Sequence, residues 1–190
     1  MYAKTLMVVT LAVAGVGLAA PPFVMPAFAA MTKMVGGAPM YPSKDIIENA
    51  VNSKDHTTLV AAVKAAGLVD TLEGAGPFTV FAPTNEAFAR LPAGTVQTLL
   101  KPENKAMLTK VLTYHVVPGR FTEAEIDAKI KEGGGKTMLK TVEGEDLTFE
   151  RGGGHLWVID EKGDKAEVTI PNVMQSNGVI QVINRVLLPS

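Results

Sequence analysis

Residues Thr79–Phe88 read TVFAPTNEAF and join an apolar strand to the start of a helix. The β-branched and aromatic residues at the beginning of this stretch predict a buried strand. Pro83 ends the strand because it has no N–H to donate to a sheet. Thr84 stands at a helix N-cap position, and Glu86 lies in the first turn, where a negative charge is favourable. The stretch therefore predicts a strand, a turn and a capped helix in immediate succession.

Helical patterns dominate the chain before residue 131, and short β-prone runs dominate after residue 136. We expect helices over Lys44–Val51, from Asp55 or Thr57 to Gly67, and over Thr84–Arg90, Thr95–Leu100, Lys101–Thr113 and Glu123–Ile130, the last on the surface. We expect strands over Phe78–Ala82, Tyr114–Val117, Lys136–Val142, Asp146–Glu150, His155–Asp160, Ala166–Pro171 and Val179–Leu188. Helices first and strands later predict an α+β domain, with helices covering part of an antiparallel sheet system.

The N-terminus has the pattern of a secretory signal peptide. Lys4 precedes the uncharged apolar run Leu6–Ala20, and the small-x-small tripeptide at residues 27–29 is typical of a cleavage site. The alternative is an uncleaved membrane anchor, but the apolar run is short for a span and prolines follow it. We expect a signal peptide over 1–29, cleaved after Ala29, a flexible leader over 30–42 and one domain over 43–190.

Composition excludes several kinds of function. The chain has no cysteine, so disulfides, thiolate metal sites and cysteine nucleophiles are excluded. A net charge of −1 gives no sign of a nucleic-acid-binding surface. No pair of spaced carboxylates, HExxH motif or Gly-x-Ser-x-Gly elbow occurs, so the sequence indicates neither a catalytic centre nor a metal site. We expect no cofactor.

Three segments in order carry a family resemblance. The first is Thr79–Phe88, the second is the Tyr114-His115 pair, and the third is Gly178–Pro189, which reads GVIQVINRVLLP. Asn177-Gly178 is expected to form a two-residue turn before this last strand. Together they resemble the fasciclin domain over most of the chain. The residues that match the two flanking motifs are Thr79, Val80, Phe81, Ala82, Pro83, Thr84, Asn85 and Phe88 in the first and Gly178, Val179 and Ile180 in the second.

The resemblance implies both a fold and a function. The fold is a wedge-shaped β-sandwich of about seven strands with helices packed on it. The function is adhesion without catalysis, in a secreted or periplasmic protein that binds a protein or polysaccharide at the cell surface. The expectation includes no nucleic acid, no membrane span after signal cleavage, and weak self-association through open strand edges. The alternative is an extracytoplasmic carrier that holds a small apolar ligand between the sheet halves.

Tyr114, His115, Val116 and Val117 form the candidate interaction segment, because the resemblance implies it: animal members of the family bind partners through regions that include the Tyr-His pair. The alternative, which we favour, is that these residues pack inside the domain. Strand alternation would place Tyr114 and Val116 on one face and His115 and Val117 on the other. A buried histidine needs hydrogen-bond partners. The side chains of Thr84 and Asn85 or a carbonyl near Pro83 are the expected ones.

Overall fold

The computed structural model describes residues 32–190, so the predicted signal peptide and residues 30 and 31 lie outside it. The helices are α1 Ile46–Ala50, α2 Thr57–Ala66, α3 Val69–Glu73, α4 Asn85–Ala89, α5 Thr95–Leu99, α6 Lys105–Tyr114 and α7 Glu123–Glu132, with 3-10 turns η1 Lys54–His56 and η2 Pro102–Asn104. The strands are β1 Lys33–Val35, β2 Ala38–Met40, β3 Phe78–Pro83, β4 Val116–Pro118, β5 Lys136–Lys140, β6 Asp146–Gly152, β7 His155–Ile159, β8 Lys165–Gln175 and β9 Gly178–Ile183. No helix among residues 32–190 is long and apolar enough to span a bilayer.

Seven strands form one mixed sheet in the order β4-β3-β9-β8-β7-β6-β5. The long strand β8 belongs to both halves of this sheet, pairing β7 through its first residues and β9 through the rest. Its register shifts between Val168 and Val173, where Asn172 has a positive φ of 55°. Such a bulge bends a strand. At the other end, Val142 N donates to Val116 O at 2.7 Å, so the two terminal strands approach each other. The expected α+β fold, with helices packed on seven strands, is confirmed.

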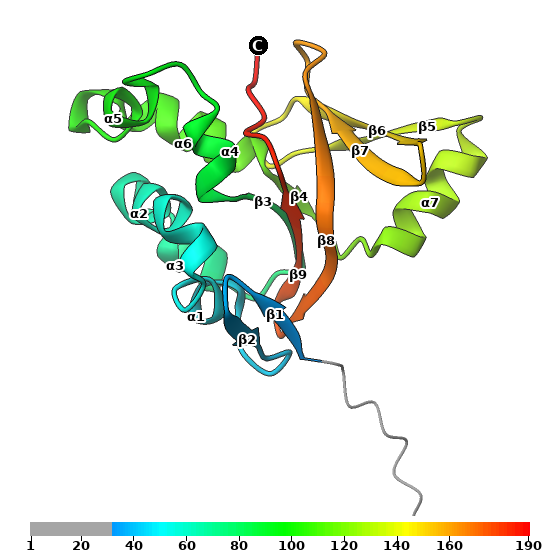
Figure 1. The fold of residues 1–190 in the computed structure, drawn as a ribbon, viewed down its shortest axis with the longest axis horizontal. Helices are drawn as coiled ribbons and strands as arrows, with labels where there is room; N and C mark the ends of the chain where they lie inside the picture. Colours follow the sequence, from blue (N-terminus) through cyan, green and yellow to red (C-terminus); the bar gives the residue numbers. More distant parts are fainter. Residues whose placement is uncertain (1–31) are drawn as a thin grey trace, which may run out of the picture.

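The prediction of an antiparallel sheet is wrong for its central pair of strands. β3 and β9 pair in parallel, with Thr79 opposite Val179 and Ala82 opposite Val182. These are the two motif strands of the sequence, and they lie side by side at the centre of the molecule (Figure 1). Every residue of β9 is buried. Parallel strands covered on both faces are typically apolar throughout.

The central strands separate two hydrophobic cores. The helix-side core lies between α1–α6 and one face of β3 and β9, and contains Val80, Ala82, Ile180 and Val182. The sandwich-side core lies between the other strand faces and α7, and contains Phe81, Phe149 and Ile183. Figure 1 shows α1–α6 on one side of β9 and α7 on the other. Alternate residues of β3 and β9 therefore belong to different cores.

Three local predictions are wrong. Residues 33–40, expected in a flexible leader, form the β1–β2 hairpin, because Gly36 and Gly37 supply the positive-φ turn and Val35 and Met40 are buried. Helix α7 is not a minor surface helix, because Ile126 and Ile130 are buried in the sandwich-side core. The tight turn before β9 consists of residues 176 and 177, because Gly178 already pairs with the last residue of β8.

Candidate functional site

The turn before β9 joins the central strands to the helices. Gly178 lies so close to β3 that an added Cβ would be 2.1 Å from the Phe78 carbonyl oxygen. The neighbouring Asn177 side chain accepts from Ile46 N at 3.1 Å. It donates to the carbonyls of Leu72 at 2.7 Å and Gly74 at 3.0 Å. This turn therefore fixes α1 and α3 against the end of β3.

Thr79 and Gln181 hold the chain segment that leads into α7. Thr79 Oγ1 donates to Gly119 O at 2.7 Å and accepts from Phe121 N at 2.8 Å. Gln181 is fully buried; its Nε2 donates to Phe121 O at 3.0 Å, and its Oε1 accepts from Asn172 N at 2.9 Å. Gln181 was not among the expected motif residues, although a glutamine within an apolar strand is itself a signal of internal hydrogen bonds.

Thr84 and Asn85 cap two different helices. Thr84 Oγ1 accepts from Ala87 N at 3.2 Å and so caps α4, as its position in the sequence predicts. Asn85 Oδ1 instead accepts from Thr58 N at 3.0 Å, and its Nδ2 donates to Lys54 O at 2.8 Å. Helix α2 has no N-cap hydrogen bond from the residue preceding it. The side chain of Asn85 therefore supplies the missing cap from α4.

Tyr114 is the last residue of α6 and His115 is the C-cap of that helix, so the strand begins only at Val116 and the expected alternation is wrong for both residues. Its side chain is fully buried. The hydroxyl donates to Asp146 O at 3.2 Å and accepts from Glu161 N at 3.1 Å. Burial raises the pKa of this phenol. Tyr114 thereby connects α6 to the β6 start and the turn after β7.

His115 is buried and uses both ring nitrogens. Nδ1 lies 2.8 Å from Val111 O, and Nε2 lies 3.0 Å from Leu187 N. A carbonyl can only accept and an amide N–H can only donate, so these partners require a neutral ring with the proton on Nδ1. Burial lowers the pKa of His115 to about 4, against smaller opposing effects of the Val111 carbonyl and the Asp160 carboxylate. The expected partners near Pro83 are therefore wrong.

The whole Tyr114–Val117 segment is interior. Val116 contributes to the helix-side core and Val117 to the sandwich-side core. The exposed fractions of the four residues are 0%, 3%, 6% and 2% in chain order. With so little accessible area, the segment offers almost no surface to a partner while this fold is intact.

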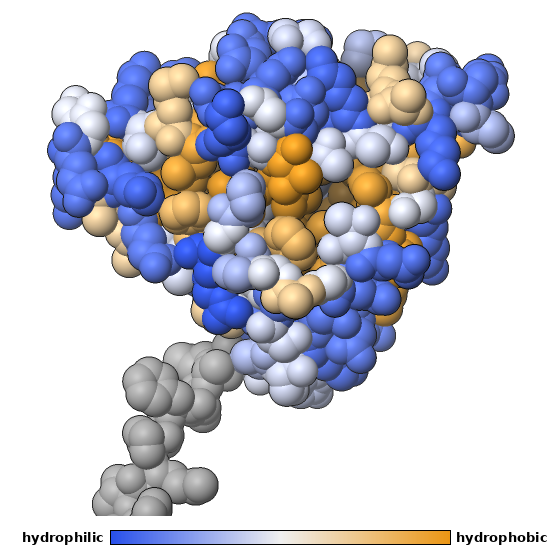
Figure 2. Space-filling model, turned by 180° about the vertical axis from the view of Figure 1, so that it is seen from behind, coloured by the Kyte–Doolittle hydropathy of each residue, from blue (hydrophilic) through white to orange (hydrophobic). Residues whose placement is uncertain are grey.

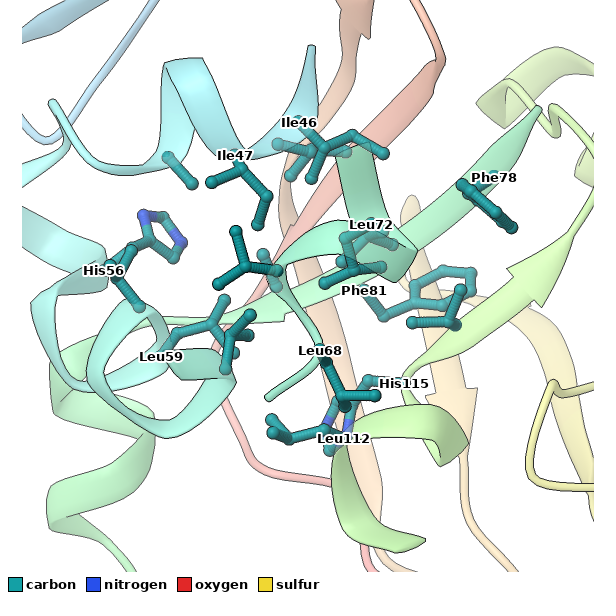
Figure 3. A pocket seen from close by; sticks show the side chains of 18 of the residues that line it. Ile46, Ile47, His56, Leu59, Leu68, Leu72, Phe78, Phe81, Leu112 and His115 are labelled. Carbon is teal, nitrogen blue, oxygen red and sulfur yellow. The ribbon is translucent and has the colours of Figure 1, made fainter. Parts of the chain in front are cut away.

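An apolar cavity of about 70 Å³ lies in the helix-side core. Its wall is formed by α1, α2, α3 and α6 on one side and by β3 and β9 on the other (Figure 3). Among the lining residues, Lys64, Thr71 and Val142 are exposed, and Leu68 and Phe78 are half-buried. Two histidines, His56 and His115, belong to this wall, and Figure 3 shows their imidazole rings.

His56 differs from His115 in its hydrogen bonding. Its side chain is 3% exposed, and Nδ1 lies 2.9 Å from Ser53 Oγ. Nε2 is buried and makes no hydrogen bond, and it is the one such side-chain atom among residues 32–190. Burial lowers the pKa of His56, although the Ala82 carbonyl and the Asp55 carboxylate favour the charged ring. A neutral imidazole with one unused nitrogen thus stands in the cavity wall.

Residues 32–190 contain no cluster of three or more His, Cys, Asp or Glu side chains that could hold a metal ion. His155 lies on the surface, where Nδ1 is 2.6 Å from Glu167 Oε1. The Lys162–Asp164 turn is held locally, since Asp160 Oδ1 accepts from the N–H groups of Lys162 at 3.0 Å and Asp164 at 2.9 Å.

Comparisons with known proteins agree with this geometry. The fasciclin domain family model matches residues 54–189. The chain is 51% identical over 144 residues to protein sll1483 of Synechocystis, covering 76% of this chain and 73% of the relative. It is 35% identical over 145 residues to the cell surface glycolipoprotein MPB83 of Mycobacterium bovis, covering 74% of this chain and 58% of the relative.

A structural comparison gives the same fold. A domain pair from the insect cell adhesion molecule fasciclin I superposes with a TM-score of 0.68 and 20% identity, covering 76% of this chain and 51% of that structure. The matched range includes the parallel β3–β9 pair and the Tyr114–Val117 segment. The chain therefore belongs to the fasciclin domain family.

Proposed function

We propose that this protein is an exported, non-enzymatic adhesion or surface-interaction module that binds a protein or polysaccharide at the cell surface. The observation that carries the proposal is family membership, with a cell surface glycolipoprotein and a cell adhesion molecule among the similar proteins. The signal-peptide pattern before residue 30 supports export. A protein released after Ala29 would begin at Ala30, which N-terminal sequencing of the secreted or periplasmic protein tests.

The exterior, rather than the Tyr114–Val117 segment, is the expected contact surface, because that segment is buried. β5 ends the sheet and exposes Lys136, Met138 and Lys140 along one strand. Terminal strands carry unpaired backbone groups to which another chain can add. Another face of the molecule shows an apolar region framed by hydrophilic side chains (Figure 2). Both are features of surfaces that bind partners.

A matched pair of variants tests the β5 surface. Met138 on β5 and Met107 on α6 are both 60% exposed, so replacing either by Asp has little effect on the core. Crosslinking in the intact cell envelope and a glycan array identify the partner. We expect Met138→Asp to weaken capture at least severalfold and Met107→Asp to leave it unchanged. Equal capture of the partner by both variants would show that the contact surface does not include Met138 on β5.

The function itself is tested by deletion of the gene in the host. We expect reduced attachment of the cells to surfaces or to one another, restored by the wild-type protein. Normal attachment, together with no crosslinked partner and no glycan above background, would contradict the proposal. Sedimentation of the purified protein over a concentration series measures whether it also self-associates.

A further inference from the structure

The cavity in the helix-side core is unlike the rest of the interior. Most of its lining side chains are apolar, from Ile46 and Ile47 in α1 to Leu112 in α6 and Ile180 in β9. Protein interiors are normally packed to crystal density, with few voids larger than a water molecule. Empty apolar cavities lower stability and can accept small organic molecules.

The one buried side-chain polar atom without a partner among residues 32–190 belongs to this cavity wall. That atom is Nε2 of His56, in a residue that lines the cavity (Figure 3). Leaving such an atom unpaired costs about 1–3 kcal/mol. A water molecule needs two to four polar partners, and the lining offers very few polar groups. A ligand atom that pairs with Nε2 would remove this cost.

Ser53 determines what the ring can offer. If His56 Nδ1 donates to Ser53 Oγ, then Nε2 is an acceptor; if the serine hydroxyl donates, then Nε2 carries the proton. Ser53 is itself buried, so its hydroxyl can rotate but stays beside His56 Nδ1. The ring can therefore accept from a ligand hydroxyl or donate to a ligand carbonyl.

We propose that this cavity is a binding site for a small, mainly apolar molecule with one hydroxyl or carbonyl group, which hydrogen-bonds to His56 Nε2. The apolar part of the ligand lies among the side chains of α1, α2 and α6. This site is separate from the exposed surface proposed for adhesion, and neither activity depends on the other.

Phenol and toluene are suitable probes because they have nearly the same size and differ by a hydroxyl in place of a methyl group. Binding is measured by titration of the ¹⁵N-labelled, host-processed protein, following amide shifts of the cavity-lining residues. We expect both probes to shift these amides and phenol to bind about three- to tenfold more tightly than toluene, the range of one net hydrogen bond.

Two variants test separately the hydrogen bond to His56 Nε2 and the free volume of the cavity. In His56→Leu the preference for phenol should disappear. In Val60→Phe the added ring enters the cavity from α2, and both probes should bind at least tenfold more weakly. Val51→Phe is the control, since Val51 is 48% exposed and does not line the cavity.

Two results would overturn the proposal. One is the absence of localised shifts with either probe. The other is equal affinity for both probes in the wild-type protein, which would mean that the nearby Ala82 carbonyl satisfies Nε2 in solution. Native mass spectrometry of protein purified from its own host then identifies the natural ligand by its added mass.

Discussion

Two buried histidines stand in the wall of one cavity, and their surroundings differ. His115 follows α6 and uses both ring nitrogens in hydrogen bonds to the backbone. His56 precedes α2 and uses only one. The first joins a helix to the C-terminal segment at Leu187, while the second lines the cavity and leaves Nε2 without a hydrogen bond. His115 is therefore a structural connection in this fold, and His56 is the group that the proposed ligand would contact.

The same contrast separates the two cores. The sandwich-side core beyond His115 contains fully buried large side chains, and the rings of Phe81 and Phe149 lie 5.3 Å apart. The helix-side core holds the cavity, and α1, α3, α4 and α5 on this side have only five residues each. Short helices depend on tertiary contacts for their position. The helix side is therefore the part in which a ligand can be accommodated with the least rearrangement.

The largest effect is expected from Phe149→Ala in the sandwich-side core. Phe149 is fully buried, and its truncation should lower the free energy of unfolding by about 3–5 kcal/mol. Leu68→Ala, at a half-buried position in the cavity wall, should cost much less. Urea unfolding measures both. Equal losses would show that the two cores are packed alike.

The next effect is a pH dependence caused by His115. The pKa of its ring is about 4 when folded and about 6.5 when unfolded, so the unfolded state binds more protons between these values. Stability is therefore complete above pH 6.5 and decreases by about 3 kcal/mol as the pH falls to 4. Urea unfolding across this range measures the slope.

His115→Gln isolates this contribution, because the amide side chain does not titrate. Its stability should fall less steeply over pH 6.5 to 4 than that of the wild type. The remaining slope includes His56, whose pKa is also lowered by burial. An unchanged slope in His115→Gln would show that His115 is not held neutral by its surroundings.

Gly178→Ala should destabilise the close contact between β9 and β3, next to the turn that holds α1 and α3. The new Cβ would meet the Phe78 carbonyl oxygen at 2.1 Å, and overpacking of this kind costs about 1–3 kcal/mol. Gly152→Ala is the control, because its nearest atom, Nε1 of Trp157, is 3.4 Å away. A thermal melt compares them. Similar melting temperatures for the two variants would contradict the close β3–β9 approach.

Asn85→Ala tests the support of the segment that carries His56. Loss of the cap on α2 should cost about 0.5–2 kcal/mol and increase hydrogen exchange at Thr58 N. Asn85→Asp keeps the acceptor for Thr58 but loses the donor to Lys54 O. If Asn85→Asp and Asn85→Ala lose the same stability, the hydrogen bond to Lys54 O, and not the cap on α2, is the contact that stabilises this segment.

Local signals in the sequence predicted much of the secondary structure. Pro83 and Thr84 mark the end of β3 and the start of α4, and Gly67 ends α2 in a left-handed conformation, as expected. These features depend on residues within one or two turns of each other. The β1–β2 hairpin was missed because its burial depends on distant residues, such as Pro171, whose carbonyl accepts from Lys33 Nζ.

The site was harder to predict because it is built from tertiary contacts. Asn85 has the sequence context of a helix start, yet its side chain caps a helix that begins 28 residues earlier. The parallel β3–β9 pair joins residues about 100 positions apart, as in Thr79 and Val179. Nothing in the sequence around His56 distinguishes it from a fully satisfied histidine, since only the fold determines what faces Nε2.

The most direct test compares His56→Leu with His115→Leu by urea unfolding at pH 7.5. His115→Leu leaves Leu187 N without its partner and should lose about 1–3 kcal/mol. His56→Leu removes a polar atom that has no partner and leaves only the buried Ser53 hydroxyl unpaired, so its loss of stability should be smaller than that of His115→Leu. Equal losses, or a larger loss in His56→Leu, would contradict the assignment of one histidine to structure and the other to a ligand.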